Sequence, residues 1–344
     1  MPETMLAAVF EGAGRLELKE VQVPGIVRGD DVLLKVDAVS ICGTDIHIVA
    51  TPPGYHATPN TILGHEFTGT VVAVGYEVSD LELGDRVVVN PNLPCGVCRQ
   101  CQAHRFNLCE NMTALGIDGD GAFAEYCRVS RRVIHRVAGD VPPGIAACAE
   151  PLACAVSAVW KASPRPGESV LVIGAGPIGL MIAMLCRASG ASLTLIAEKA
   201  PFRVAFARSL KLGQVIDVTE QDLEEAIRGI TTIGADLVFD VVGSQLAQAV
   251  ELVRKGGRVV PFGVQAQAIC SLPQSHVTMK EVTVIGSWLA NASFPIAVSL
   301  LEDDSVARGL SKLVTHRIGL TEIWDGIELL RKGQAIKVVV DPSR

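Results

Sequence analysis

The fold is decided by the stretch Val170-Leu-Val-Ile-Gly174-Ala-Gly176-Pro177-Ile178-Gly179. Apolar residues typical of a buried strand lead directly into a GxGxxG turn, and a helical stretch follows from about Pro177 to Ser189. In this motif the first glycine makes a tight turn, the second lets the backbone approach a pyrophosphate, and the third permits close helix–strand packing. Free N–H groups at the start of the helix bind the phosphates. The stretch therefore predicts a dinucleotide site at Gly174, Gly176, Pro177, Ile178 and Gly179.

An acidic residue, Glu198, follows the next apolar run, Leu193–Ala197, and lies nineteen residues after Gly179. Its carboxylate would accept hydrogen bonds from the adenosine ribose and repel a 2′-phosphate, which favours NAD over NADP. Lys199 and Arg203 are close in sequence and would weaken this preference. We expect Glu198 and Arg203 to contact the cofactor. The alternative for Glu198 is a strand-end acid that faces solvent.

Apolar strands alternate with helical stretches through this part of the chain. Further strands are expected at Leu237–Val241, Arg258–Phe262 and Val282–Ile285. Continuous apolar strands between helices indicate a parallel sheet with both faces covered. We therefore predict an α/β fold with a doubly wound Rossmann domain over residues 153–289.

The first 150 residues have a different pattern, with short β-rich runs separated by glycine and proline. Strands are expected at Val32–Val39, Phe67–Val74 and Val87–Val89, and a last strand at Lys337–Val340. We expect the chain to return to this first domain after about Leu289. The second predicted domain thus combines residues 1–152 and 290–344.

The composition excludes several classes of protein. The chain has 344 residues, of which 49% are hydrophobic and 19% charged, so it is long enough and apolar enough for two buried cores. A net charge of -7 argues against a nucleic-acid partner, because phosphate binding needs a basic face. There is no apolar run long enough to cross a membrane and no basic N-terminal leader, so we expect a cytoplasmic protein.

Four of the ten cysteines fall within fifteen residues, as Cys95-x2-Cys98-x2-Cys101-x7-Cys109. This spacing matches a tetrahedral zinc site of four thiolates, which is closed and therefore structural. Such a site would also hold the polar, aperiodic segment 91–113 in shape, because metal bonds replace the missing core. An iron–sulfur cluster and free thiols are the alternatives. His104, inside this segment, is expected at the surface.

A second set of metal-type residues is spread along the chain. Cys42 stands in Cys42-Gly-Thr44-Asp-Ile-His47, His65 and Glu66 follow Gly64, and Glu150 begins Glu150-Pro-Leu. Each is weak evidence alone, since a buried cysteine or a single histidine usually belongs to a core. In combination with the four-cysteine segment and GxGPxG, however, the whole chain resembles the zinc-containing medium-chain dehydrogenase/reductase superfamily. Glu66 after His65, and Glu-Pro-Leu, resemble its polyol (sorbitol) and threonine dehydrogenase branch.

The resemblance implies a GroES-like, β-rich catalytic domain beside the Rossmann domain, and one catalytic and one structural zinc per chain. It implies that Cys42, His65 and Glu66 bind the catalytic zinc, and that Glu150 is a fourth, exchangeable ligand or holds the metal-bound water. Thr44 and His47 match the positions that relay the substrate proton in the family. Such a zinc lowers the pKa of an alcohol, and the nicotinamide accepts its hydride. For Thr44 a turn hydroxyl, and for His47 a core histidine, are the alternatives.

The substrate is open to three interpretations. A polyol, cyclitol or sugar fits best, because the segment between Asp45 and Gly64 lacks the tryptophan-rich, acidic stretch associated with threonine dehydrogenases. An amino alcohol such as threonine is the alternative substrate, and a non-catalytic module that kept the fold is a third possibility. The pocket-wall candidates are Tyr55, His56, Phe123, Trp288 and Asn291. The family also implies a homo-oligomer, a dimer or homotetramer, paired through residues 282–287.

Overall fold

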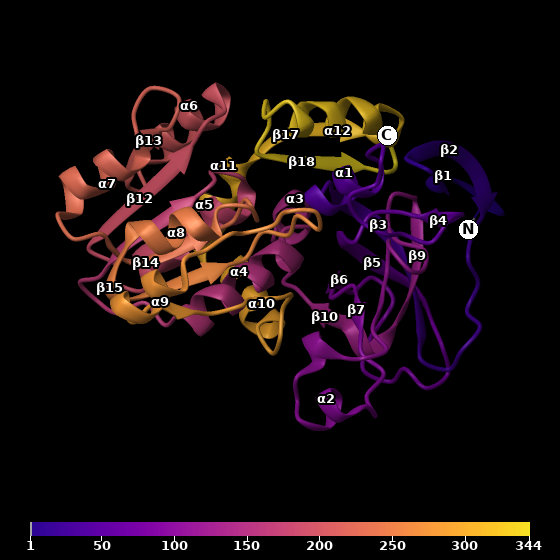
Figure 1. Cartoon of the computed structure of the whole chain (residues 1–344). Coiled ribbons are helices and arrows are strands. Elements are labelled where there is room, and N and C mark those ends of the chain that lie inside the picture. The colour runs from indigo at the N-terminus through magenta and orange to yellow at the C-terminus, as the bar shows by residue number, and fades with distance from the viewer. Residues whose placement is uncertain (1) are drawn as a thin grey trace. The chain divides into compact units, whose positions relative to one another are not determined.

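The computed structural model describes residues 2–344, which form two compact units (Figure 1). The first unit combines Met1–Ala153 with Asn291–Arg344, and the second comprises Cys154–Ala290. Each unit is organised around a sheet of its own. Within the described residues, no helix has both the length and the apolar character that a membrane crossing requires.

The second unit is built on a six-stranded sheet in which all neighbouring strands run parallel. The strands are β11 (Ser169–Ile173), β12 (Leu193–Glu198), β13 (Gln214–Asp217), β14 (Ala235–Asp240), β15 (Val253–Pro261) and β16 (Thr283–Val284). Their spatial order is β13-β12-β11-β14-β15-β16, with β11 at the point where the order reverses. This is the order of a dinucleotide-binding doubly wound sheet, so the predicted fold class is confirmed.

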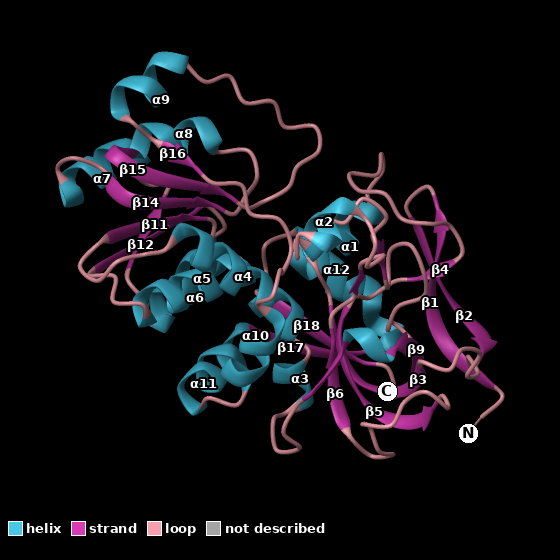
Figure 2. Cartoon of the chain, turned by 90° about the horizontal axis from the view of Figure 1, so that it is seen from below, coloured by secondary structure: helices cyan, strands magenta, loops and turns pink. Residues whose placement is uncertain are grey.

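Helices cover both faces of this sheet (Figure 2). They are α5 (Pro177–Ala188), α6 (Pro201–Leu210), α7 (Leu223–Thr231), α8 (Leu246–Leu252) and α9 (Gln274–Lys280). In Figure 2 α5 and α6 lie on one side of the strands, and α7, α8 and α9 on the other. Both faces are therefore buried, which explains why strands such as Val170–Ile173 are apolar throughout.

One strand differs from its sequence-based expectation. The expected strand begins at Arg258, whereas β15 begins at Val253 and includes a glycine pair, Gly256–Gly257. Two glycines indicate a turn from sequence alone. In the structure they form an irregularity inside the strand, because the register against β14 shifts between Ala235 and Leu237 and Gly256 has a positive φ of 68°. The expected strands at 170, 193 and 237 and the helix at 177 are confirmed with shifts of one or two residues at their ends.

The first unit is mainly β-structure. Its large sheet has the order β10-β6-β5-β3-β18-β17, with β9 also paired to β3, and a small sheet has the order β2-β1-β4. The strands are β1 (Thr4–Gly12), β2 (Arg15–Gln22), β3 (Asp31–Ser40), β4 (Thr61–Ile62), β5 (Glu66–Val74), β6 (Arg86–Val89), β7 (Asn92–Leu93), β8 (Thr113–Ala114), β9 (Tyr126–Ser130), β10 (Ile134–Arg136), β17 (Val314–Gly319) and β18 (Lys337–Asp341). The four strands expected here are confirmed.

Short helices connect these strands. They are α1 (Gly43–Ile48), α2 (Arg99–Gln102), η1 (Phe106–Leu108), η2 (Arg131–Val133), α3 (Pro143–Ala146), α10 (Phe294–Leu301), α11 (Asp304–Leu313), η3 (Leu320–Glu322) and α12 (Ile323–Arg331); α4 (Ala149–Ala162) leads out of the first unit. The C-terminal strand β18 returns to the centre of the large sheet, where it pairs with β3. Residues near the two ends of the chain therefore share one core, which includes Val36, Ile41, Ile327 and Val338.

The strand register brings distant residues together at one edge of the first unit. Ser40, at the end of β3, lies opposite Glu66, at the start of β5, and also opposite Val339 in β18. The chain leaves β3 through Ile41 and Cys42 directly into α1. The antiparallel pairing of β3 and β5 therefore sets Cys42 beside His65 and Glu66.

Candidate functional site

Three of the residues predicted to bind the catalytic metal form a cluster. One ligand atom each from Cys42, His65 and Glu66 lies within 4.8 Å of the other two. His65 is 5% exposed and Glu66 only 1%. Zinc bonds of about 2.0–2.3 Å at tetrahedral angles place two ligand atoms about 3.3–3.8 Å apart, so movements of about 1–1.5 Å at most suffice to bind the ion. Three such ligands leave one tetrahedral position free for a substrate.

Local structure holds each of these ligands. Cys42 is the N-cap residue of α1, and its backbone N–H donates to the Asp45 carboxylate at 2.8 Å. The other oxygen of Asp45, Oδ1, faces His65 Nδ1 at 3.6 Å. A carboxylate at Nδ1 fixes the ring orientation and leaves Nε2 to bind a metal. Asp45 thus holds Cys42 through a hydrogen bond and places a carboxylate oxygen beside the His65 ring.

Burial and neighbouring charges shift the pKa values of Cys42 and His65. Burial raises the pKa of the Cys42 thiol, and Glu66 raises it further. Burial alone would lower the pKa of His65, but Asp45 and Cys42 raise it well above its usual value. Neither Asp45 Oδ1 nor His65 Nδ1 has a hydrogen-bond partner in the described part of the chain, although both atoms are buried. A cation in the cluster would compensate this concentration of thiol and carboxylate groups, so the donor set fits a zinc ion.

A buried lysine holds the third ligand. Lys337 Nζ, from β18, donates to Glu66 Oε2 and, at 3.4 Å, to the Ile41 carbonyl. The Ser40 hydroxyl donates to the same Glu66 oxygen. Burial on its own would lower the pKa of Lys337, but Glu66 and Cys42 raise it above its usual value. Because Oε2 already has two donors, Oε1 is the oxygen of Glu66 that is available to a metal.

Sequence reasoning missed Lys337, Ser40 and Asp45. A signal existed for the lysine, because it stands inside the apolar run Ile336-Lys-Val-Val-Val, and lysine is almost never fully buried without a partner. Nothing in the sequence identifies the partner, which depends on the pairing of β18 with β3.

The predicted relay residues Thr44 and His47 lie on α1, three positions apart and therefore on one helix face. Both are half-buried. The backbone carbonyl of His47 accepts the N–H of Gly54 at 2.8 Å, and a Cβ at Gly54 would lie 3.2 Å from His47 Nδ1. The imidazole is thus packed against the segment that follows α1.

The predicted fourth ligand, Glu150, is not part of the three-residue cluster in the described structure. It lies in the first turn of α4 and is 8% exposed. Two residues earlier, burial raises the pKa of the Cys148 thiol to about 12, and the charges of Lys337 and Glu66 also act on it. The start of α4 is therefore near the cluster.

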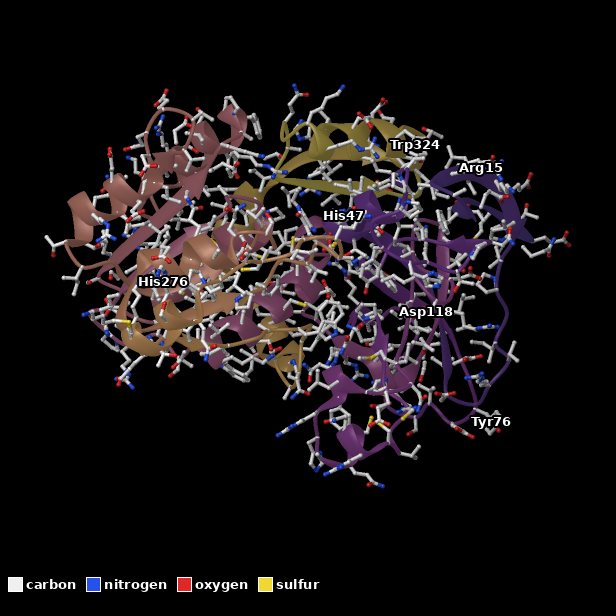
Figure 3. The ribbon with its side chains drawn as sticks, viewed as in Figure 1. Arg15, His47, Tyr76, Asp118, His276 and Trp324 are labelled. Carbon is white, nitrogen blue, oxygen red and sulfur yellow. The ribbon has the colours of Figure 1, made fainter. Side chains whose placement is uncertain are left out.

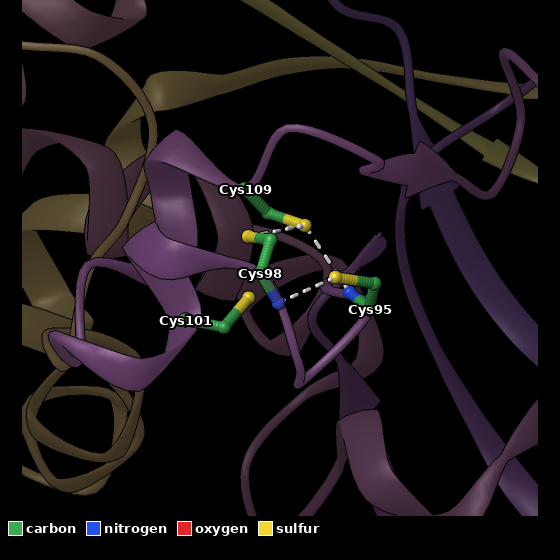
Figure 4. Close-up of side chains that lie close together, drawn as sticks. All are labelled: Cys95, Cys98, Cys101 and Cys109. Atoms are coloured by element: carbon green, nitrogen blue, oxygen red, sulfur yellow. Dashed lines mark hydrogen bonds between the residues drawn. The ribbon is translucent and has the colours of Figure 1, made fainter.

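Cys95, Cys98, Cys101 and Cys109, in the lobe formed by residues 91–113, make up a second cluster (Figure 4). The backbone N–H of Cys95 donates to Cys109 Sγ at 3.2 Å, and that of Cys98 donates to Cys95 Sγ at 3.4 Å. N–H groups of Val97 and Cys98 lower the pKa of Cys95 to about 6, which favours its thiolate. All four sulfurs lie within 4.8 Å of one another, as in a closed tetrathiolate zinc site. His104, inside the lobe, is exposed.

The glycine motif in the second unit has the geometry of a phosphate-binding turn. Gly174 follows β11 with φ of 109°, and Gly176 is the N-cap of α5. A Cβ on Gly179 would lie 2.0 Å from the Gly174 carbonyl oxygen, so only glycine permits this helix–strand contact. A Cβ on Gly176 would meet only Arg203 Nη1, at 4.0 Å. Gly176 therefore presents an open backbone beside a cationic side chain, which fits a pyrophosphate. Pro177 and Ile178 form the first turn of α5.

Glu198, at the end of β12, is connected to this turn. Its Oε2 accepts the N–H of Ala175 at 2.9 Å, and its Oε1 accepts those of Lys199 and Ala200 at 2.7 and 2.9 Å. The side chain is 8% exposed. A carboxylate with three backbone donors is fixed in place, here directly beside the glycine loop.

The pocket-wall candidates differ in their surroundings. Phe123 is completely buried in the core of the first unit and contacts the Gly64 region, so its proposed place on a pocket wall is wrong. Tyr55 and Asn291 are half-buried in the first unit, whereas His56 is exposed. Trp288 is 37% exposed in the second unit.

Comparison with known proteins adds an independent line of evidence. Residues 28–139 match the alcohol dehydrogenase GroES-like domain, and residues 177–303 match the zinc-binding dehydrogenase domain. The chain is 36% identical to an L-threonine 3-dehydrogenase of Caldanaerobacter subterraneus, covering 91% of the chain and 92% of that protein. It is 31% identical to a sorbitol dehydrogenase of Bacillus subtilis (100% and 99%) and 36% identical to a D-altritol 5-dehydrogenase of Agrobacterium fabrum (93% and 94%).

Solved structures are similar over the full length. A zinc-binding dehydrogenase of Sinorhizobium meliloti 1021 bound to NADP has a TM-score of 0.91 and 33% identity, covering 99% of this chain and 100% of that one. An alcohol dehydrogenase of E. coli CFT073 complexed with NADH has a TM-score of 0.89 and 29% identity, with the same coverage.

Proposed function

Because this chain belongs to the zinc-containing medium-chain dehydrogenase/reductase superfamily, in its polyol and threonine dehydrogenase branch, we propose that Cys42, His65 and Glu66 hold its catalytic zinc. The chain is a zinc-dependent oxidoreductase that transfers a hydride between a secondary alcohol and a nicotinamide cofactor. The observation that carries the site assignment is the three-ligand cluster, which leaves a coordination position free. A non-catalytic module would have no need of such an open position. The four-cysteine lobe is the proposed site of the structural zinc.

In the proposed reaction the protein's own residues bind, orient and move a proton. The bound zinc supplies Lewis acidity that makes the substrate hydroxyl easier to ionise, and NAD accepts the hydride. Thr44 Oγ1 accepts the proton of the substrate hydroxyl as its own hydroxyl proton passes to the His47 ring, which then releases a proton to solvent. Asp45 keeps the His65 ring in its binding orientation, and Lys337 with Ser40 hold Glu66 so that Oε1 is presented. Glu150 is the proposed exchangeable fourth ligand.

The proposed substrate class is a polyol, cyclitol or sugar. Relatives named for sorbitol and D-altritol support it. The segment after α1 also lacks the tryptophan-rich, acidic stretch associated with threonine dehydrogenases. Oxidation of an amino alcohol is the second candidate, because relatives at 34–36% identity are named L-threonine 3-dehydrogenase. We favour polyols, cyclitols and sugars, because their adjacent hydroxyl groups can bind both the zinc and polar side chains.

The proposed cofactor is NAD rather than NADP, bound through Gly174, Gly176, Pro177, Ile178, Gly179, Glu198 and Arg203. The fixed carboxylate of Glu198 beside the glycine loop supports this choice, because it would accept ribose hydroxyls and repel a 2′-phosphate. Arg203 lies beside Gly176, where it would attract the pyrophosphate.

Assembly and location are also proposals. The edge strand β16 is short and exposed, and it offers unpaired backbone groups to a second copy of the chain. A homodimer or homotetramer paired through this edge would cover it. We place the protein in the cytoplasm, because the thiolates of the lobe need a reducing environment.

One experiment separates the candidate functions. Sorbitol, xylitol, inositols, sugars and threonine are offered one at a time with NAD to the zinc-loaded protein, and NADH is read by absorbance. Turnover of a polyol or sugar supports the proposal, and turnover of threonine alone supports the second candidate. If no secondary alcohol yields NADH, the proposed function is wrong.

A further inference from the structure

Two loops of the first unit meet beside the proposed metal site. One is residues 51–60, which follow α1, and the other is residues 115–121, which follow β8. The Thr58 N–H donates to the Ile117 carbonyl at 2.8 Å and joins the two loops. The Gly54 N–H donates to the His47 carbonyl at 2.8 Å and fixes the first loop to α1. The loops are therefore held in place relative to the helix that carries the proposed proton relay.

Tyr55 lies in the first loop directly after Gly54, the residue at which this loop packs against His47. Its ring is half-buried and packs on the same core as Ile46 and Ile117. Burial raises the pKa of the Tyr55 phenol, Asp118 raises it further, and His65 lowers it. The phenol therefore interacts electrostatically both with Asp118 of the second loop and with the proposed metal ligands His65 and Cys42. None of the described residues accepts a hydrogen bond from its hydroxyl.

Asp118 is exposed, and one of its carboxylate oxygens accepts a hydrogen bond within the turn that contains it. Its Oδ2 accepts the N–H of Ala114 at 2.8 Å, and its backbone N–H donates to the Ala114 carbonyl at 2.8 Å. The turn therefore fixes the side chain, while Oδ1 stays available to a ligand. Figure 3 labels Asp118 and His47, which both belong to the first unit.

We propose that Tyr55 and Asp118 bind the hydroxyl groups of a polyhydroxylated substrate that lie beyond the carbon being oxidised, and so determine the preference for polyols. The proposal rests on the proposed function and deepens it. A phenol both donates and accepts, and a carboxylate oxygen accepts from a vicinal hydroxyl pair. A simple secondary alcohol has one hydroxyl, which is used at the zinc, so it cannot reach these side chains.

The same carboxylate could also attract the ammonium group of an amino alcohol, and a substitution separates the two. Asp118→Asn retains an oxygen that accepts the Ala114 N–H and hydrogen bonds from hydroxyls, but it removes the negative charge. In this variant kcat/KM for a polyol should fall only a few-fold. For an ammonium substrate it should fall much further, because the ion pair is lost. Asp118→Ala removes both kinds of interaction.

The test compares kcat/KM for the best polyol of the panel with that for 2-butanol, in the zinc-loaded protein with NAD. Tyr55→Phe and Asp118→Ala should each lower the polyol value about tenfold, mainly through KM, and leave 2-butanol within about twofold. Tyr126→Phe is the matched control, because Tyr126 is half-buried in β9 and has no place in the proposed pocket. Calorimetry of polyol binding to the protein–NADH complex should show the same loss without turnover.

The possible outcomes distinguish failure of the proposed substrate class from failure of the proposed role of Tyr55 and Asp118. A wild type that oxidises 2-butanol but no polyol refutes the proposed substrate class and this proposal with it. A wild type that oxidises polyols, with the polyol-to-butanol ratio unchanged in Tyr55→Phe and Asp118→Ala, refutes this proposal alone. An equal fall for both substrates shows a structural effect and also overturns it.

Discussion

Two substitutions in the glycine motif should have different effects: Gly179→Ala should lower stability, whereas Gly176→Ala should weaken cofactor binding. In Gly179→Ala the new Cβ would lie 2.0 Å from the Gly174 carbonyl oxygen, whereas real contacts are at least 3.0 Å, so the backbone must move by about 1 Å. Overpacking costs about 1–3 kcal/mol, and the upper end applies because the obstructing atom belongs to the backbone. For a unit of about 137 residues this loss lowers Tm by about 10 °C.

Gly176→Ala should have the opposite profile. The backbone there has φ of −69° and ψ of 178°, which alanine adopts freely, and the new methyl would meet only Arg203 at 4.0 Å. The change in stability should stay within about 1 kcal/mol. The methyl would, however, stand where the backbone approaches the pyrophosphate, so the Kd for NADH should rise about tenfold or more.

Thermal denaturation followed by circular dichroism and NADH titration by fluorescence measure the two effects. Gly229→Ala is the control, because a Cβ at this position in α7 has nothing within 4 Å, and alanine should raise Tm slightly. If Gly176→Ala binds NADH as tightly as the wild type, the pyrophosphate is not at this turn. If Gly179→Ala has the Tm of the wild type, the helix–strand contact is looser than the geometry requires.

Three further predictions concern charge and metal. Cys42→Ser should retain the fold but bind only one of the two zinc ions, counted by elemental analysis, and should lose turnover. Two bound zinc ions and full activity in this variant would contradict the catalytic site. Cys98→Ser should instead lower Tm. Lys337→Met leaves a buried carboxylate without its cation and should cost the metal-free protein about 3–5 kcal/mol in urea unfolding. Lys312→Met, at an exposed position, is its control, and equal unfolding curves for the two would refute the ion pair. Glu198→Ala should reduce the ratio of kcat/KM for NAD over NADP, and equal values for both cofactors in the wild type would remove the basis of the NAD assignment.

The sequence predicts the second unit well because its decisive features are local. A strand, a glycine turn and a helix follow one another within twenty residues, so periodicity and turn chemistry suffice for β11 and α5. The Gly256–Gly257 pair shows the limit of this reasoning, because its glycines form an irregularity within β15 that only the neighbouring strand reveals.

The first unit was harder to predict because its site depends on strand register. The residue types of Cys42, His65 and Glu66 suggest metal ligands, and the family resemblance assigns them, but neither predicts what holds them. Lys337 reaches Glu66 from 271 residues away in the sequence. Which apolar strand pairs with which is decided by long-range packing that a single sequence does not encode in any local pattern.

The pairing of β18 with β3 has a consequence for how the site forms. Glu66 is almost completely buried, and burying an ionised carboxylate without a partner costs several kcal/mol. Its partner, Lys337, is the first residue of β18, so the ligand cluster can be stable without metal only after this strand has joined the sheet. The structure therefore makes assembly of the metal-binding edge depend on the last strand of the first unit. Removal of residues 337–344 should accordingly remove the catalytic zinc while the four-cysteine lobe, which has its own short-range ligands, keeps its metal.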